Sequence, residues 1–269
     1  MQKTLLLTGS TDGIGLETAK RLVSEGQRVL VHGRNRAKLD AVVQELSALP
    51  GAGAAEGFAA DLSKLDEVDA LASAVLERHP RLDVLINNAG VFATREARTP
   101  EGLDVRFVVN AIAPYLLAQR LLPALGSTGR IVNLSSAAQA PVDTQALAHG
   151  GALSDGAAYA QSKLALTMWS RSLALAHPDG PVVVAVNPGS MLGTKMVKQA
   201  YGVAGADLSI GVDILVRAAL GEDFASASGQ YFDNDARRFA APHPDALDAS
   251  RCAEVVGAIE SVLTRRSAS

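Results

Sequence analysis

Short apolar segments alternate with longer segments of helical periodicity along most of this chain. The short segments are apolar at nearly every position, which is typical of parallel strands buried on both faces of a sheet. The pattern predicts strands at residues 3–7, 28–32, 57–60, 82–86, 130–134 and 182–186, with 231–232 in a seventh. It predicts helices at residues 16–25, 36–46, 65–78, 102–125 and 159–176.

This alternation indicates an α/β fold, a doubly wound parallel sheet of about seven strands with helices on both faces. No repeat or linker divides the chain, so residues 1–269 are expected to form one domain. Two segments, 139–156 and 190–207, lack a clear period. Both follow the carboxyl ends of predicted strands, where open α/β sheets bind ligands. They are therefore expected either to wall a substrate site or to be surface loops.

A glycine turn at residues 8–15 separates the first predicted strand from the first helix, with the sequence Thr-Gly-Ser-Thr-Asp-Gly-Ile-Gly. Its backbone N–H groups and the positive end of the helix can hold a diphosphate, because glycine lets an anion approach the backbone closely. The absence of a Gly-Lys-Ser/Thr ending argues against a nucleotide triphosphatase. The glycines alone would also fit a tight strand–helix turn without a ligand.

The composition is that of an ordinary globular enzyme, with 48% hydrophobic and 20% charged residues. A net charge of -3 gives no reason to expect nucleic acid as a partner, and no apolar run approaches the length of a transmembrane helix. The single cysteine, Cys252, cannot form an internal disulfide, which favours a cytoplasmic location. The five histidines lack metal-ligand spacing, so no metal is expected, and each is interpreted as a surface or loop residue.

Tyr159 and Lys163 lie four positions apart on one predicted helix, so their side chains share a face. An ammonium group near a phenol lowers the phenol's pKa, which suits general acid–base catalysis. Ser135 and Ser136 end the fifth predicted strand, where a hydroxyl could stabilise charge on a substrate oxygen. Each of these features also has a purely structural interpretation, as an exposed helix pair or a strand cap.

Pro114 predicts a kink in the helix at residues 102–125, because proline lacks an N–H group and crowds the carbonyl four residues earlier. That carbonyl belongs to Asn110, and once freed from the helix it could hold a water molecule. A kink that serves packing alone is the alternative.

The motifs occur in the order Thr8-Gly9-x-x-x-Gly13-Ile14-Gly15, Asn87-Asn88-Ala89-Gly90, Asn110, Ser136, Tyr159-x-x-x-Lys163 and Asn187-Pro188-Gly189. In this joint pattern the chain resembles the short-chain dehydrogenase/reductase family along nearly its whole length. The resemblance implies a single Rossmann-type domain and a nicotinamide cofactor.

Four catalytic roles follow from the resemblance. It implies that Tyr159 is the acid–base group and that Lys163 binds the ribose and tunes the tyrosine. It implies that Ser136, rather than Ser135, polarises the carbonyl and that Asn110 holds a water in a proton relay. The cofactor-binding residues implied beside Tyr159 and Lys163 are Gly9, Ser10, Thr11, Asp12, Gly13, Ile14, Gly15, Arg34, Asn35, Asp61, Leu62, Asn88, Ala89, Gly90, Pro188, Gly189, Met191 and Thr194.

Two features depart from the common family pattern. Ser136 and Tyr159 lie 159 − 136 = 23 positions apart, a long spacing that looks like the retinol-dehydrogenase-like branch. The family usually has a threonine at the position of Gly193, whereas here Thr194 comes next, which weakens its assignment as a contact to the nicotinamide amide.

The cofactor is expected to be NADP(H), with NAD(H) as the alternative. An NAD enzyme places an acid near the end of the second strand to bind the ribose 2′-hydroxyl, but residues 30–36 contain none. Arg34 offers a planar donor fork for a 2′-phosphate, although either Arg34 or Arg36 could instead be solvated at a helix start. Asp61 resembles the family's adenine-contacting acid, and it could also be the N-cap of the next helix.

The sequence therefore predicts an NADP(H)-dependent oxidoreductase that transfers hydride between its cofactor and a carbonyl or alcohol. Apolar residues in the two irregular segments favour an apolar substrate, while Lys195 and Lys198 are interpreted as solvated. A dinucleotide-binding sensor with little turnover is the alternative function. Surplus apolar positions on the helices that carry Asn110 and Tyr159 predict a homodimer or homotetramer; these positions are Val105, Val108, Ile112, Leu116, Leu164, Met168 and Leu175.

Overall fold

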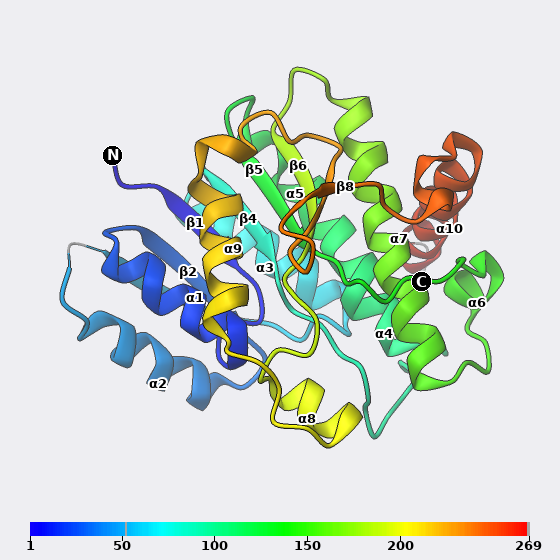
Figure 1. Cartoon of the computed structure of the whole chain (residues 1–269), viewed down its shortest axis with the longest axis horizontal. Coiled ribbons are helices and arrows are strands. Elements are labelled where there is room, and N and C mark those ends of the chain that lie inside the picture. The colour runs from blue at the N-terminus through cyan, green and yellow to red at the C-terminus, as the bar shows by residue number, and fades with distance from the viewer. Residues whose placement is uncertain (52, 268–269) are drawn as a thin grey trace.

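One eight-stranded sheet runs through the molecule, and helices cover both of its faces (Figure 1). The computed structural model describes residues 1–51 and 53–267. The strand order is β3-β2-β1-β4-β5-β6-β7-β8, and every neighbouring pair is parallel except β7 and β8. The strands are β1 (Thr4–Leu7), β2 (Arg28–Gly33), β3 (Ala54–Ala59), β4 (Val84–Asn87), β5 (Arg130–Leu134), β6 (Val182–Asn187), β7 (Tyr231–Asp233) and β8 (Arg238–Ala240).

The helices form two layers. In one layer, α1 (Gly13–Ser24), α2 (Arg36–Ser47) and α9 (Ser209–Leu220) share a core cluster. In the other, α3 (Leu65–Arg78), α5 (Ala113–Leu125) and α7 (Asp155–Ala176) share a second cluster, with α10 (Ala249–Ser267) packed outside α7 (Figure 1). The remaining helical elements are α4 (Val105–Phe107), the π-helical turn η1 (Val108–Ile112), α6 (Thr144–His149), α8 (Lys195–Tyr201), η2 (Glu222–Phe224) and η3 (Pro244–Leu247).

Successive strand side chains alternate between the two clusters, which explains why the strands are apolar at nearly every position. In β1, Leu5 and Leu7 point into the cluster of α1 and α9, whereas Leu6 points into the cluster of α3 and α7. All three leucines are buried. A strand with water on one face would need polar residues at every second position, so the predicted doubly wound sheet is confirmed.

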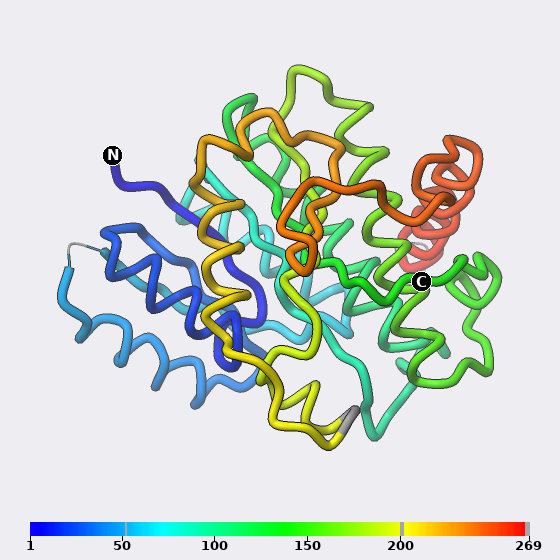
Figure 2. Tube along the Cα trace, viewed as in Figure 1, coloured from blue at the N-terminus to red at the C-terminus, as the bar shows by residue number. Residues whose placement is uncertain are grey.

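The chain reverses direction across the sheet between β3 and β4. After β1 it moves outward through β2 and β3, then returns to place β4 on the other side of β1 (Figure 2). The crossovers to either side of β1 lie on opposite faces of the sheet and leave a crevice beyond the carboxyl ends of β1 and β4. Open α/β sheets bind ligands at such a crevice. The glycine turn leaves the sheet at this point.

The element boundaries differ from the sequence prediction in several places. The third strand begins at Ala54 rather than at residue 57, and β8 adds an antiparallel edge strand that was not predicted. Helix α7 begins at Asp155, four residues before the predicted start. The segments 139–156 and 190–207 are not wholly irregular, since they contain α6 and α8 respectively. Both helices are too short for their periodicity to stand out from the flanking loops.

The apolar faces that suggested an oligomer are largely covered by α10 of the same chain. Ile112, Leu116, Leu164 and Met168 are buried in one cluster with the α10 residues Val255, Ile259 and Val262. Tyr115 in α5 donates to Glu260 Oε1 in α10 at 2.8 Å. Leu175 alone of the predicted set is largely exposed, at 65%. The homodimer or homotetramer stays a prediction, but its argument from surplus apolar surface is lost.

One stretch, Val105–Leu125, has the length and hydropathy of a membrane span, contrary to the expectation that none would. Within the fold, 78% of its most apolar window is buried, as in the core helix of a globular protein. Its apolar character therefore has a sufficient cause in packing between α3 and α7.

Candidate active site

The glycine turn lies directly against the end of β4. Gly9 has a φ of 65°, and a Cβ added there would meet the Cα of Ala89 at 2.8 Å. A Cβ on Gly15 would meet the Gly9 carbonyl oxygen at 2.3 Å. Asn88 closes the contact, because its Nδ2 donates to the carbonyls of Thr8 at 2.8 Å and Gly9 at 3.1 Å. Only glycine allows this approach, which places the turn against the end of β4 at the start of α1, where the N–H groups of a helix N-terminus can face a ligand.

His32 is a buried structural residue, not the surface or loop residue that the sequence suggested. It is 3% exposed, its Nδ1 accepts from Gly9 N at 3.1 Å, and its Nε2 lies 3.0 Å from the Ala60 carbonyl. A neutral ring satisfies both bonds at once, accepting at Nδ1 and donating at Nε2. Burial lowers the pKa of His32 from 6.5 to about 4, so the ring stays neutral. It thereby links the glycine turn to the ends of β2 and β3.

Asp12 is the N-cap of α1, and its carboxylate pairs with two lysines. Its Oδ1 accepts from Gly13 N at 2.9 Å, and its Oδ2 accepts from Lys38 at 2.8 Å and from Lys195 at 2.5 Å. Lys195 is therefore not simply solvated, as the sequence suggested, but joins α8 to the glycine turn. Burial raises the pKa of Asp12, but the hydrogen bonds from Lys195 and Lys38 outweigh it, and the pKa falls to about 2.

Tyr159 and Lys163 share one face of α7, as predicted, beside the end of β5. The Lys163 Nζ lies 5.7 Å from the centroid of the Tyr159 ring and donates to the Leu134 carbonyl at 2.7 Å. Lys163 is 4% exposed, and burial lowers its pKa from 10.5 to about 8. Its ammonium is thus charged at neutral pH and close enough to favour the phenolate form of Tyr159.

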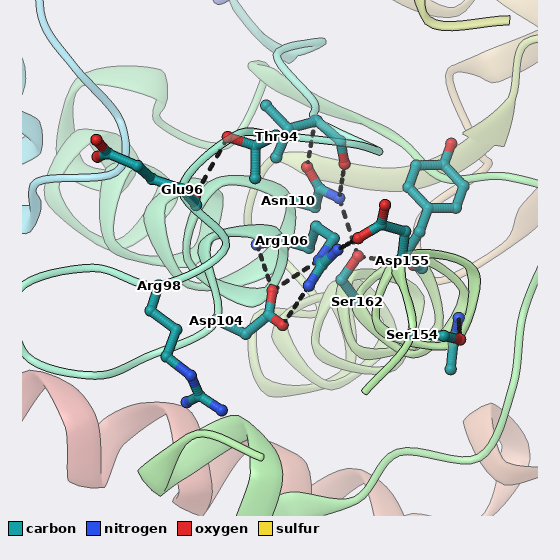
Figure 3. A network of polar contacts seen from close by, with 12 residues as sticks. Thr94, Glu96, Arg98, Asp104, Arg106, Asn110, Ser154, Asp155 and Ser162 are labelled. Carbon is teal, nitrogen blue, oxygen red and sulfur yellow. Dashed lines mark hydrogen bonds and ion pairs between the residues drawn. The ribbon is translucent and has the colours of Figure 1, made fainter. Parts of the chain in front are cut away.

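Asn110 lies in the π-helical turn η1, just before Pro114, where the sequence predicted a kink. Its side chain is 1% exposed, and it accepts from Val91 N at 2.8 Å and donates to Val91 O at 2.9 Å. It also donates to Ser162 Oγ at 2.9 Å (Figure 3). A π-helical turn inside an α-helix often marks a functional position. Here it aims Asn110 at both the loop after β4 and helix α7.

The structure distinguishes the two serines at the end of β5. Ser135 is 3% exposed, and its hydroxyl lies 2.6 Å from Thr167 Oγ1 within the core. Ser136 is partly exposed, and its Oγ accepts from Ala138 N at 3.1 Å, which leaves its O–H free to donate to a ligand. Of the two hydroxyls, only that of Ser136 can reach a substrate oxygen.

A pocket of about 300 Å³ opens beside the glycine turn. Its polar wall is Asp12, Arg34, Lys195 and Gln199, and its apolar wall is Val91, Phe92, Ala93 and Met196, joined by Gly90. The Phe92 ring centroid lies 5.1 Å from that of Tyr159. Gly90 lies beside two of the predicted catalytic side chains, since a Cβ added there would be 3.5 Å from both Asn110 Oδ1 and Lys163 Nζ.

The two arginines after β2 have different partners. Arg36 Nε donates to both carboxylate oxygens of Asp40, at 3.1 and 3.3 Å. Arg34 lines the pocket and forms no ion pair with any residue in the described ranges 1–51 and 53–267. Its guanidinium is the one of the two that is available to a phosphate.

Several predicted contact residues already have structural roles in the fold. Ser10 is buried, its hydroxyl donates to the Leu7 carbonyl at 2.9 Å, and its N–H donates to the His32 carbonyl at 3.0 Å. Asn35 is the N-cap of α2, and Thr194 is the N-cap of α8. Asp61 accepts from Ser63 N and Oγ in the turn before α3, whose N-cap is Lys64, so the N-cap alternative for Asp61 is wrong.

The turn after β6 is held by residues that the sequence analysis missed. Asp235 accepts from Asn187 Nδ2 at 2.9 Å and from Ser190 N at 2.8 Å, and Asn234 donates to the Pro188 carbonyl at 2.9 Å. These bonds fix Gly189, whose φ is 122°, at the edge of the site. The signal was present in Asp233-Asn234-Asp235, three turn-forming polar residues directly after a predicted strand.

The residues present fit a dinucleotide cofactor. The glycine turn offers backbone N–H groups at a helix N-terminus, Arg34 offers a free guanidinium, and both face the pocket that leads to Tyr159. The Lys163 ammonium, the Tyr159 phenol and the Ser136 hydroxyl then lie at one edge of the sheet. This arrangement can hold a developing negative charge on an oxygen and deliver a proton to it.

Comparison with known proteins finds a matching family and similar solved structures. Residues 3–202 match the family model described as short chain dehydrogenase. Dehydrogenase/reductase SDR family member 13 from Bos taurus is 34% identical over 86% of this chain, which spans 66% of that relative's length. Human retinol dehydrogenase 13 is 30% identical, with 91% of this chain and 80% of the relative covered. The solved structure of angucycline C-6 ketoreductase LanV with bound NADP has 28% identity and a TM-score of 0.69, with 86% of this chain and 93% of that chain covered.

The buried His32 makes stability depend on pH. Its native pKa of about 4 lies below the usual 6.5, so the unfolded chain binds more protons between these values. The contribution of the neutral His32 ring to the free energy of unfolding is complete above pH 6.5. As the pH falls toward 4, the free energy of unfolding decreases by about 3 kcal/mol. Urea denaturation at several pH values should show a shallower acid-side slope for His32→Gln than for the wild type. The exposed control His149→Gln should keep the wild-type slope, and equal slopes for all three proteins would contradict the prediction.

Proposed function

Because the chain belongs to the short-chain dehydrogenase/reductase family, we propose that it is an NADP(H)-dependent oxidoreductase acting on an apolar carbonyl or alcohol. The observation that carries this proposal is the convergence of Asn110, Ser136, Tyr159 and Lys163 at one sheet edge beside the glycine turn. No observation favours a sensor without turnover, since every group that the chemistry requires is present.

The chemistry needs one proton movement from the protein. The bound nicotinamide supplies or accepts the hydride. In the reducing direction, the Ser136 hydroxyl donates a hydrogen bond to the substrate oxygen and stabilises the charge that develops there. Tyr159 gives that oxygen its proton, and the charged Lys163 ammonium stabilises the phenolate left behind. In the oxidising direction the same phenolate accepts the proton from the alcohol.

Preference for NADP(H) rests on the charge around Arg34. Asp12 lines the same pocket and would repel a phosphate, but Lys38 and Lys195 both pair with it. The positive charge of Arg34 is therefore opposed by no unpaired acid of the pocket. NAD(H) would gain nothing from this guanidinium, because a 2′-hydroxyl is best bound by a carboxylate.

An apolar substrate is supported by the wall of the pocket next to Tyr159. Val91, Phe92, Ala93 and Met196 line it, while its charged residues lie on the side of the glycine turn and Arg34. Met191, in the segment after β6, adds an apolar side chain that is 40% exposed. Pockets of this kind bind ligands mainly through apolar area, with a few polar groups fixing the orientation.

A cytoplasmic location is also part of the proposal. Its support is the single cysteine, Cys252, which is buried and free, as expected of a protein that does not rely on disulfides.

Removing the Tyr159 hydroxyl should abolish turnover but not cofactor binding. We expect Tyr159→Phe to lower kcat by roughly 10²–10⁴-fold, the usual contribution of a general acid–base group. NADPH affinity, measured by calorimetry, should change little. Tyr115→Phe is the matched control, because it loses a hydroxyl that bonds to Glu260 between helices. A Tyr159→Phe variant with near-normal turnover would refute the role of Tyr159 as the acid–base group.

Cofactor preference should depend on Arg34 and not on Arg36. Calorimetric titration of the wild type should show tighter binding of NADPH than of NADH. Arg34→Ala should remove that preference and Arg34→Asp should invert it, whereas Arg36→Ala should retain it because Arg36 already pairs with Asp40. Equal affinities of the wild type for both cofactors would contradict the charge argument.

Substrate class is tested by paired assays with NADPH. The wild type should have a higher kcat/KM for a long-chain or ring ketone than for a polar sugar carbonyl at equal concentration, because desolvating the sugar hydroxyls beside Phe92 is unfavourable. Met196→Ser should reduce the kcat/KM for the ketone more than that for the sugar. A wild-type preference for the sugar would overturn the assignment.

A further inference from the structure

A buried arginine joins the two helices that carry Asn110 and Tyr159. Arg106 is 1% exposed, and its guanidinium holds the Asp104 carboxylate through two parallel bonds, Nε to Oδ1 at 2.8 Å and Nη2 to Oδ2 at 2.7 Å. Its remaining terminal nitrogen, Nη1, donates to Asp155 Oδ1 (Figure 3). We call these three residues the Arg106 clamp.

Both carboxylates of the clamp lie at helix N-termini. Asp104 is the N-cap of α4, where its Oδ1 also accepts from Arg106 N at 2.9 Å. Asp155 is the first residue of α7, and the N-cap before it is Ser154, whose Oγ accepts from Ala157 N at 3.3 Å. Negative charge is favourable at both places because of the helix dipole. The clamp therefore fixes the start of one helix to the start of the other.

The clamp lies one helical turn from two residues of the catalytic set. Asn110 follows Arg106 by four positions, and Tyr159 follows Asp155 by four, so each pair shares a helix face. A second link lies beyond them, where Asn110 Nδ2 donates to Ser162 Oγ and Ser162 Oγ donates to the Tyr159 carbonyl at 2.7 Å. The backbone of Tyr159 is thus held between two cross-helix links.

We propose that Arg106 is a positioning residue for the reaction, holding the first turns of α7 so that Tyr159 stays aligned with Asn110. This inference rests on the proposed function, because it assigns Arg106 a role in the same site. Replacing a buried ion pair by apolar residues is often neutral or stabilising, so net stability alone is a weak reason for this clamp. Fixed geometry is a better one, since a displacement of about 1 Å can cost ~10²-fold in rate.

Asp155 is the residue to vary, because Arg106 itself is a poor choice. Without Arg106, the buried Asp104 carboxylate would have no counterion, and the protein could lose its fold. The Asp155 side chain is 52% exposed, and its removal leaves the Arg106–Asp104 pair intact. Ser154→Ala is the matched control, because it removes the N-cap side chain of the same helix and leaves every bond of the clamp in place.

Steady-state kinetics separate positioning from helix stability. We expect Asp155→Ala to lower kcat by roughly 10–100-fold with little change in the KM for NADPH, while Ser154→Ala keeps kcat within about twofold. Similar kcat losses in the two variants would show that turnover depends on the stability of the first turn of α7 and not on the clamp. This result would overturn the proposal. An Asp155→Ala variant with the kcat of the wild type would overturn it as well.

Hydrogen–deuterium exchange tests the clamp without relying on turnover. In Asp155→Ala, exchange should accelerate both at residues 156–163 and across the interface at residues 105–110. In Ser154→Ala, only residues 156–163 should respond. If the wild type shows no turnover but Asp155→Ala still accelerates exchange in both segments, the proposed function is refuted and the link between the helices is retained. Unchanged exchange at residues 105–110 in Asp155→Ala would refute the clamp.

Discussion

The burial of one ammonium group constrains the whole site. Lys163 is 4% exposed, and a charge so far from water must be hydrogen-bonded to remain there. Its donor bond to the Leu134 carbonyl, 2.7 Å long, requires the end of β5 to lie beside α7. Gly90 lies beside this group, since a Cβ added there would be 3.5 Å from the ammonium, an ordinary van der Waals distance. The sheet edge, helix α7 and the loop after β4 are thus fixed together, and the phenol of Tyr159 lies beside the charge.

Short polar side chains that bind backbone groups hold the remaining parts in place. Asn88 binds the glycine turn, Asn110 binds both polar groups of Val91, and His32 links the turn to the ends of β2 and β3. Each bond joins elements that are distant in sequence. Because buried backbone groups must be paired, displacing one element would leave polar groups of another unsatisfied. Rigidity at the site therefore comes from the same bonds that complete the fold.

Two lysines pair with the one carboxylate of the glycine turn. The Asp12 carboxylate lies at the positive end of α1, where a diphosphate would also bind, yet it pairs with Lys38 and Lys195. Arg36 pairs with Asp40 in the same way, so Arg34 is the cation of this group that remains for a ligand. Which cation remains for a ligand thus depends on which charges are already paired, and not on the number of cations.

The sheet and the glycine turn follow from the sequence alone, and the sequence also predicts the four candidate catalytic positions. Period and local spacing encode these features, because a strand buried on both faces must be apolar throughout and Tyr159 must share a helix face with Lys163. Which side chains contact one another is visible only in the tertiary structure. It buried His32, showed Ser136 rather than Ser135 to be accessible, joined Lys195 to Asp12 and placed α10 over the helices expected at an oligomer interface. The Arg106 clamp belongs to this second class, since nothing in the local sequence relates Asp104 to Asp155. Contacts between residues so far apart arise from packing, and packing is not visible in the spacing of residues along the chain.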